Sequence, residues 1–324
     1  MGPGVRQLAI TSFVGVRPWA VAEERVRRFL EVYRPRWLYV MFSGGRDSSA
    51  VLAAALSVTR RVVAVYVHIA GQTHAVNLRA AKRVAERLNV PFVTVGVVRR
   101  REEVAEKVHG AVEEHGMPIV VHMITVDFYT GLDYWAAVEA HGLPAPAERG
   151  GKGHRWCCLN FKAKWLWRLP RNAIIDGRPA RAQAAGIRWE ESWYRRRAYR
   201  VDTRLPVKAS KSDDGATNYT LLPIIDMTLP EVTEMLEHYG ILDVVEEQYR
   251  LLGFSPNCIL CPLANREMLE RAVRILPDGY LLRVLTVLEK LESSGRLGSF
   301  TSEKLSLMKR AILEELRRRG VHYG

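Results

Sequence analysis

The stretch "YVMFSGGRDSSAVLAAAL" (residues 39–56) decides how the first half of the chain is expected to fold. The apolar run at 37–43 follows Pro35 and predicts a short buried strand, because it is continuous rather than alternating. The alanine-rich run at 47–58 predicts a helix, and the serines before it supply capping groups. Two glycines and a cluster of hydroxyls therefore join a buried strand directly to a helix.

A strand that enters a helix through "SGGRDS" (43–48) brings several backbone N–H groups and the positive end of a helix dipole to one point. Phosphate is the natural occupant of such a junction. Asp47 suits an anion site only if it holds a metal ion or orients the loop. The alternative is a tight, well-capped turn with a purely structural role. The residues that we expect to contribute to an anion site are Ser43, Gly44, Gly45, Asp47, Ser48 and Ser49.

Two common nucleotide fingerprints are absent from the loop. The chain has neither G-x-G-x-x-G nor G-x-x-x-x-G-K-[ST] at this junction, which argues against a dinucleotide dehydrogenase and a Walker-type ATPase.

The chain after the loop alternates between strand and helix patterns. Branched apolar runs at 60–69, 91–98 and 119–126 predict strands, and the segments 77–90 and 101–116 predict helices. Such alternation predicts an α/β fold with a doubly wound, mostly parallel sheet. Ligands bind beyond the carboxyl ends of the strands in such sheets, which is where the glycine loop lies.

The remainder of the chain is expected to end in helices. The segments 172–177 and 219–226 are strand-like, and the polar segment 207–218 predicts a surface loop or a boundary. From 229 onward the pattern is mainly helical. We therefore expect three regions, which are an N-terminal helical extension (1–34), a nucleotide-binding α/β domain (35–228) and a helical C-terminal region that carries the second cysteine pair (229–324).

Composition predicts a globular protein with acidic partners. The 324 residues are 48% hydrophobic, with 48 Lys and Arg against 35 Asp and Glu, a net charge of +13. Positive charge attracts nucleotides and nucleic acids, although an arginine-rich, thermophilic proteome would explain it equally well. The sequence contains no apolar run of about 18 residues, the minimum for a membrane-spanning helix. We also find no signal peptide at 1–16, so we expect a cytoplasmic protein with no membrane partner.

The four cysteines fall in two pairs, Cys157–Cys158 and Cys258–Cys261. In a reducing compartment, such a set favours metal binding or redox chemistry over structural disulfides. Two adjacent cysteines fit poorly around one tetrahedral zinc ion, whereas each can bind a different iron of a cubane. We favour a [4Fe–4S] cluster; zinc, two disulfides and unrelated thiols are the alternatives.

The motifs together resemble a known superfamily. "SGGRDS" is similar to the S-G-G-x-D-S signature of the PP-loop, or N-type ATP pyrophosphatase, superfamily, which implies an adenine nucleotide alpha hydrolase-like fold. The Cys-Cys…Cys-x-x-Cys pattern resembles the phosphoadenosine/adenosine phosphosulfate (PAPS/APS) reductase branch. The segments similar to that branch are "CCLNFKAKWL" (157–166), "GIRWEESWYR" (186–195), "LLPIIDMTLPEVTEML" (221–236) and "LLGFSPNCILCP" (251–262).

The resemblance implies roles for particular residues. Ser43, Gly44, Gly45, Asp47 and Ser48 would hold nucleotide phosphates, and "HIAGQTH" (68–74) would flank the adenine and ribose. Anionic groups would be bound by Lys162, Arg188 and Arg195, since arginine suits bidentate contact with phosphate or sulfate. Each of these could equally be a solvated surface charge. His68 and His74 are weaker candidates. The implied catalytic residues are Asp47, Ser48, Lys162 and Arg188.

Two features depart from the reductase branch. Its C-terminal Cys-Gly-x-His-type motif supplies the attacking thiolate, but this chain ends in "RRRGVHYG" and has no cysteine there. The loop is also intact, whereas the reductases tend to carry a degenerate version. Both departures favour an enzyme that binds ATP and Mg²⁺, adenylates an acceptor and transfers sulfur with the help of the cluster. The positive charge suits a tRNA or DNA acceptor, and a cysteine desulfurase would be a natural sulfur-donating partner.

Two further hypotheses remain. One is a sulfonucleotide reductase that borrows its nucleophile from an external, thioredoxin-like thiol. The other is a non-catalytic sensor of nucleotide or redox state.

Tryptophans are concentrated near the first cysteine pair. Trp165 and Trp167 in an amphipathic segment predict core packing, while Trp189 and Trp193 also suit a stacking platform for nucleic acid.

Overall fold

A computed structural model describes residues 17–144, 156–253, 258–262, 264–295 and 299–323. The strands form one eight-stranded sheet in the order β3-β4-β2-β1-β6-β8-β7, with β5 paired to β6 at the side. The strands are β1 (Leu38–Phe42), β2 (Val62–Ile69), β3 (Phe92–Val98), β4 (Ile119–Thr125), β5 (Ala173–Ile175), β6 (Arg178–Ala185), β7 (Val207–Lys211) and β8 (Thr217–Leu221).

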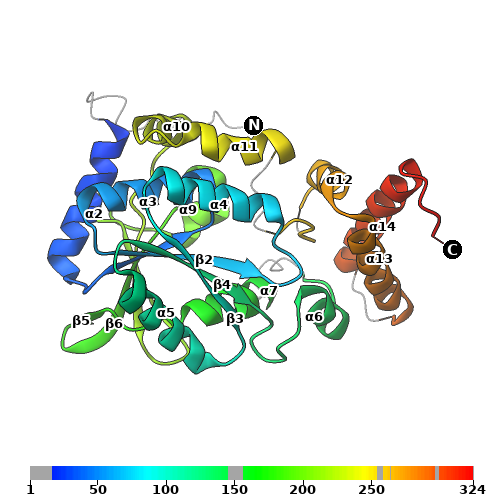
Figure 1. Cartoon of the computed structure of the whole chain (residues 1–324), viewed down its shortest axis with the longest axis horizontal. Helices are drawn as coiled ribbons and strands as arrows, with labels where there is room; N and C mark the ends of the chain where they lie inside the picture. Colours follow the sequence, from blue (N-terminus) through cyan, green and yellow to red (C-terminus); the bar gives the residue numbers. More distant parts are fainter. Residues whose placement is uncertain (1–16, 145–155, 254–257, 263, 296–298, 324) are drawn as a thin grey trace.

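The helices lie on both faces of the sheet and at one of its ends (Figure 1). Most of them occupy the segments that the sequence predicted to be helical. They are α2 (Pro18–Tyr33), α3 (Arg46–Val58), α4 (Ala75–Arg87), α5 (Arg101–His115), α6 (Tyr134–His141), α7 (Trp156–Cys158), the π-helix η1 (Leu159–Ala163), α8 (Lys164–Leu166), the 3₁₀ turn η2 (Trp189–Glu191), α9 (Trp193–Ala198), α10 (Leu229–His238), α11 (Leu242–Leu252), α12 (Arg266–Ile275), α13 (Asp278–Ser293) and α14 (Ser299–Arg318).

The predicted fold class is confirmed. The strand β1 lies between β2 and β6 and runs parallel to both, and β4 is parallel to β2 and β3. One face of the sheet is covered by α2, α3, α4, α10 and α11, and the other is covered by α5 and by the buried Trp165 of α8. The expectation that Trp165 packs in the core is therefore also confirmed. Parallel strands covered on both faces must be apolar throughout, which is why these strands lack alternation.

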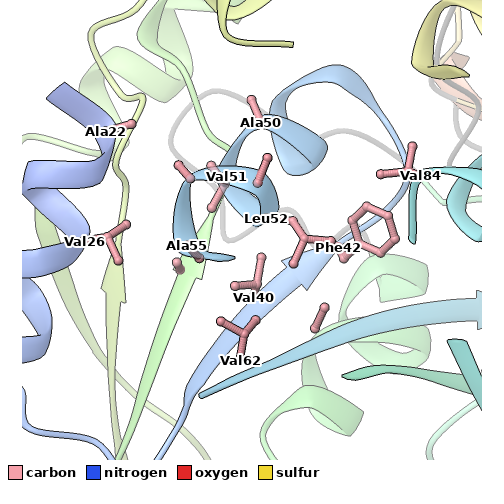
Figure 2. Close-up of a cluster of buried hydrophobic side chains, with 14 of the residues drawn as sticks. Ala22, Val26, Val40, Phe42, Ala50, Val51, Leu52, Ala55, Val62 and Val84 are labelled. Atoms are coloured by element: carbon pink, nitrogen blue, oxygen red, sulfur yellow. The ribbon is translucent and has the colours of Figure 1, made fainter. Parts of the chain in front are cut away.

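The alanine-rich helix α3 is buried because it lies between the sheet and its neighbouring helices. Figure 2 shows Val40 of β1 below Val51 and Ala55 of α3, with Val26 of α2 to one side and Val84 of α4 to the other. Small side chains make α3 thin, so that α2 and α10 approach it closely. This packing fixes the position of the loop from which α3 starts.

Two segments depart from the sequence-based expectation. The segment 207–218 was predicted to be a surface loop or boundary, but it forms the edge strand β7 and the start of β8, joined as an antiparallel hairpin. Its side chains are polar because β7 is an exposed edge, where lysines also discourage further strand pairing. Strand β6 was not predicted, because its alanines have low strand propensity, although β6 pairs with both β1 and β8.

The mainly helical C-terminal region is confirmed, and its helices pack in two different cores. The helices α10 and α11 join the core formed by β1, α2 and α3. The helices α12, α13 and α14 instead form a second core with α6 and Cys157, beyond the end toward which β2 points (Figure 1). The division at residues 34 and 228 stays a proposal, and residues 1–16 of its first region lie outside the described part of the chain.

No helix in the described ranges combines the length and apolarity needed to cross a membrane.

The histidine His122 is buried within the sheet. The hydroxyl of Thr94 lies 3.0 Å from His122 Nδ1, and the His68 ring lies 5.5 Å away, centroid to centroid. Burial, with smaller contributions from His68 and Lys82, lowers the pKa of His122 to about 4.

We predict that this histidine destabilises the protein in mild acid. An unfolded histidine has a pKa near 6.5, so from pH 6.5 toward 4 the unfolded state binds a proton that the folded state does not. The free energy of unfolding should therefore fall over this window, by up to about 1.4 kcal/mol for each unit of pKa difference. Urea unfolding of the wild type and His122→Phe at several pH values measures the effect. Between pH 6.5 and 4 the variant should lose less unfolding free energy than the wild type. The same dependence on pH in both proteins would contradict the prediction.

Candidate functional site

The glycine loop lies between β1 and α3, as the sequence predicted. Gly44 has a φ of +77°, and a Cβ at this position would lie 3.0 Å from the backbone nitrogen of Ala81 in α4. Both the left-handed conformation and the close approach require glycine. The loop is thus held against α4 as well as at the end of β1.

The serine hydroxyls mostly stabilise the loop itself. The Ser48 hydroxyl accepts the Ser43 N–H at 3.1 Å and donates to the Gly45 carbonyl at 3.1 Å, while the Ser43 hydroxyl lies 3.0 Å from it. Ser49 is fully buried on the core side of α3, and its hydroxyl has no hydrogen-bond partner among the described residues. Backbone N–H groups, more than hydroxyls, are therefore what the loop offers to an anion.

Asp47 and Arg188 meet although 141 residues separate them. The Arg188 Nε donates to Asp47 Oδ1 at 2.8 Å, and the same guanidinium pairs with Glu190. Arg188 is buried, so it is a fixed component of the site and not a solvated surface charge. The structure brings together two of the residues that the sequence singled out separately.

A second glycine allows that meeting. A Cβ on Gly186 would lie 2.5 Å from the carbonyl carbon and 2.6 Å from the carbonyl oxygen of Asp47. The end of β6 therefore approaches the start of α3 more closely than any other residue would permit.

The helix α11 also contacts the loop, and the sequence analysis did not predict this role. The Gln248 side-chain amide donates to the Gly44 carbonyl at 2.5 Å. The Arg46 guanidinium pairs with Glu246 and lies 3.8 Å from the Tyr249 ring centroid. These contacts fix the first turn of α3 from the side opposite to the sheet.

Asn77 is another residue that the sequence reasoning missed. It lies on α4, one turn before the Ala81 that touches Gly44, and it is 1% exposed. Neither its amide nitrogen nor its amide oxygen has a hydrogen-bond partner in the described part of the chain. A buried amide without partners is costly, which makes Asn77 a candidate ligand-binding group.

The remaining candidates occupy different positions. His74 caps α4, because its Nδ1 accepts the Val76 N–H at 3.2 Å, and burial lowers its pKa. His68 is half-buried beside His122, and burial lowers its pKa too. Arg195 lies on α9 and pairs with Glu191. Neither the Arg195 pair nor the His74 cap contacts Asp47 in the described hydrogen bonds and ion pairs.

The four cysteines come together from two distant segments. Contact with Cys158 and burial raise the pKa of Cys157, and Cys258 and Cys261 raise it further. Burial raises the pKa of Cys258 to about 11, while the nearby Lys162 opposes the shift. The thiols are thus within electrostatic reach of one another. As they are placed, however, the described residues contain no ready-made group of three or more His, Cys, Asp or Glu side chains that could hold a metal ion.

The cysteines lie at the carboxyl ends of the strands that follow β1. The Ile259 N–H, between Cys258 and Cys261, donates to the Gln72 carbonyl just after β2, at 3.2 Å. The Thr125 hydroxyl at the end of β4 donates at 2.7 Å to the Phe161 carbonyl in η1, the π-helix that follows Cys158 and carries Lys162. Such π-helical turns are frequent at functional sites. The cysteines and the glycine loop therefore share one end of the sheet.

One comparison with known proteins matches the loop region, and two solved structures resemble the chain weakly. A family model described as "Queuosine biosynthesis protein QueC" matches residues 38–108, which run from β1 into α5. The chain is also similar to the structure of NMN synthetase from Francisella tularensis, at 13% identity and a TM-score of 0.40, over 95% of this chain and 98% of that one. It is similar as well to the NH₃-dependent NAD synthetase from Campylobacter jejuni, at 12% identity and a TM-score of 0.34, over 95% of this chain and 99% of that one. No curated protein matches significantly.

The class of protein follows from the loop and its match. The S-G-G-x-D-S loop, its place at the end of the central parallel strand and the QueC match over that region indicate the PP-loop, adenine nucleotide alpha hydrolase-like class. The match spans a minor part of the chain, so it indicates the class and not a particular family. Neither the family model nor the two structures is a sulfonucleotide reductase.

We predict that Gly186→Ala damages the loop. The new Cβ would force the start of α3 away from β6, and we expect a loss of about 1–3 kcal/mol in the free energy of unfolding. The matched control is Gly110→Ala, a helical position with no atom within 4 Å of the added Cβ. There the change should stabilise by about 0.5–1 kcal/mol. Urea unfolding of the wild type and both variants measures the difference. A Gly186→Ala variant as stable as the Gly110→Ala variant would contradict the close approach.

Proposed function

We propose that the chain is a PP-loop enzyme that binds ATP and Mg²⁺ at the loop after β1, adenylates an acceptor and transfers sulfur to it with the help of a [4Fe–4S] cluster. The observation that carries the proposal is the convergence of an intact phosphate loop and four thiols at one end of the sheet. ATP use alone would not require the thiols, and redox chemistry alone would not require the intact loop.

The loop suits the departing pyrophosphate. Its backbone N–H groups and the N-terminus of α3 supply fixed positive potential where charge develops, without reorganisation during the reaction. Asp47 would hold Mg²⁺ or orient the loop, with Arg188 keeping its carboxylate in place. An acceptor oxygen attacks the α-phosphorus, the bond to pyrophosphate breaks, and a sulfur nucleophile then displaces AMP from the adenylated carbon.

The donor set fits an iron–sulfur cluster in its chemistry. The four thiols, from α7 and from the loop before α12, also surround the fully buried Tyr134, whose pKa is raised first by burial and then by all four thiols. Cys157, Cys158, Cys258 and Cys261 would be the ligands, and Lys162 beside Cys258 would balance part of the negative charge. When bound, the cluster would supply the sulfur-handling or electron-transfer chemistry. The segment that precedes Cys258 (254–257), including part of the motif "LLGFSPNCILCP", lies outside the described residues.

We predict selective, Mg²⁺-dependent ATP binding. Calorimetric titration of the anaerobically purified full chain with ATP, APS and PAPS should give affinity for ATP only. Asp47→Asn should weaken ATP–Mg²⁺ binding by about 10–100-fold, since it removes a charge-assisted contact. Glu113→Gln, an exposed position on α5, is the control and should bind like the wild type.

Other results would point to another function. Preference for a sulfonucleotide would mean a reductase whose thiol comes from a thioredoxin-like partner. Wild-type cellular behaviour of an Asp47→Ala strain would favour a non-catalytic sensor.

The cysteines give a separate prediction. Anaerobic protein should contain about four iron and four acid-labile sulfide per chain, the stoichiometry of one cubane. Cys158→Ser and Cys258→Ser should each lose most of both, while circular dichroism shows that the fold persists. One zinc per chain without sulfide would overturn the cluster and leave a thiolate zinc site.

A further inference from the structure

The segment 193–200, which we call the α9 arm, exposes an aromatic ring among arginines. Trp193 is 71% exposed, although tryptophan is usually well buried. The Arg197 guanidinium lies 6.0 Å from the centroid of the Trp193 ring, a geometry within the range of cation–π contacts. The side chain thus offers a flat apolar face to the solvent with positive charge beside it.

Three of the four arginines of the arm lack a carboxylate partner in the described part of the chain, Arg195 being the one that is paired. These three are Arg196, Arg197 and Arg200. Elsewhere the exposed arginines often form ion pairs, as in α2, α4, α12 and α14, which is the usual state of an arginine-rich surface. The acidic groups near the arm are already paired, and these pairs are Glu190 with Arg188, Glu191 with Arg195, and Asp202 with Arg204.

A groove lies beside the arm. Its volume is about 400 Å³, and it is lined by Trp189, Arg196, Arg200, Val201 and Asp202. The Trp189 indole N–H donates to the Tyr199 carbonyl at 2.8 Å, so the turn η2 before the arm is tied to the end of the arm. The groove is therefore lined by two arginines of the same arm that exposes the Trp193 ring.

The arm is connected directly to the phosphate loop. Arg188, which holds Asp47, is followed by the single turn η2 and then by α9. Trp193 is five residues beyond Arg188, so their Cα atoms lie at most about 18 Å apart. A polymer lying on the arm could therefore reach the place where the loop would activate an acceptor.

We propose that the α9 arm binds single-stranded nucleic acid, and this assignment rests on the proposed function because it names the acceptor class for that site. A stacking face combined with unpaired arginines matches the alternation of bases and phosphates in a single strand. An acidic peptide would use the charges but leave the Trp193 face unexplained. An anionic membrane would favour a longer amphipathic helix than the six residues of α9.

The test is fluorescence anisotropy with a labelled oligo(U) or oligo(dT) and the full-length protein across a range of salt concentrations. Trp193→Ala should weaken binding at least about fivefold through lost stacking. The triple variant Arg196→Gln, Arg197→Gln, Arg200→Gln should reduce the slope of log K against log salt by about two, since each phosphate contact contributes about 0.7. The matched control is Arg60→Gln, Arg61→Gln, Arg178→Gln, three exposed arginines just before β2 and at the start of β6, at the opposite end of the sheet.

Equal losses in the arm variant and the control variant, or full binding by Trp193→Ala, would overturn the proposal. Arm-dependent binding to phosphatidylglycerol vesicles without oligonucleotide binding would assign the arm to a membrane and overturn it as well. ATP titration of the same variants separates this inference from the proposed function. Arm variants that bind ATP normally but have lost oligonucleotide affinity would support nucleic-acid binding by the arm. A wild-type protein that binds the oligonucleotide but not ATP would contradict the proposed function, and with it the acceptor role of the nucleic acid.

Discussion

The close backbone packing around the first turn of α3 is the constraint on which the candidate site depends. Gly44 lies against Ala81 of α4, and Gly186 lies against Asp47 of α3 itself. Two glycines thus let a strand end, a loop and two helices approach at distances that a Cβ would forbid. The first turn of α3 and its backbone N–H groups are thereby fixed at the carboxyl end of the central strand, an arrangement that suits the anion site that we propose.

Residues that are distant in the sequence contact this loop and stabilise it. The helix α11 contributes Gln248 and Glu246, and the segment after β6 contributes Arg188. None of these contacts is local, and each adds a charged or hydrogen-bonded partner to a loop that would otherwise be held by backbone geometry alone. Charge-assisted contacts of this kind are stronger than neutral ones, particularly where burial excludes water. The glycine loop is therefore held by α4, α11 and the segment after β6.

The cysteine end of the molecule is joined to the same strands through other contacts. Tyr280 of α13 lies within hydrogen-bonding distance of the Gly71 carbonyl and of Gln72, and the Ile259 N–H donates to Gln72. The loop after β2 therefore contacts both the α/β sheet and the C-terminal helices. In the function that we propose, a nucleotide bound near this loop would contact elements that also position the thiols.

The sequence by itself predicted the S-G-G-x-D-S loop between a strand and a helix, and the parallel sheet around it. Strands such as Val62–Ile69 are continuous apolar runs, and the loop chemistry is local, so pattern and motif were sufficient. Strand β6 was missed because its alanines carry little propensity, and its place between β1 and β8 comes from packing. Three features were decided only by the tertiary structure. They are the contact of Asp47 with Arg188, the Asn77 amide that has no partner in the described ranges, and the exposure of Trp193. Each depends on strand order and helix packing across the chain, which residue spacing does not encode.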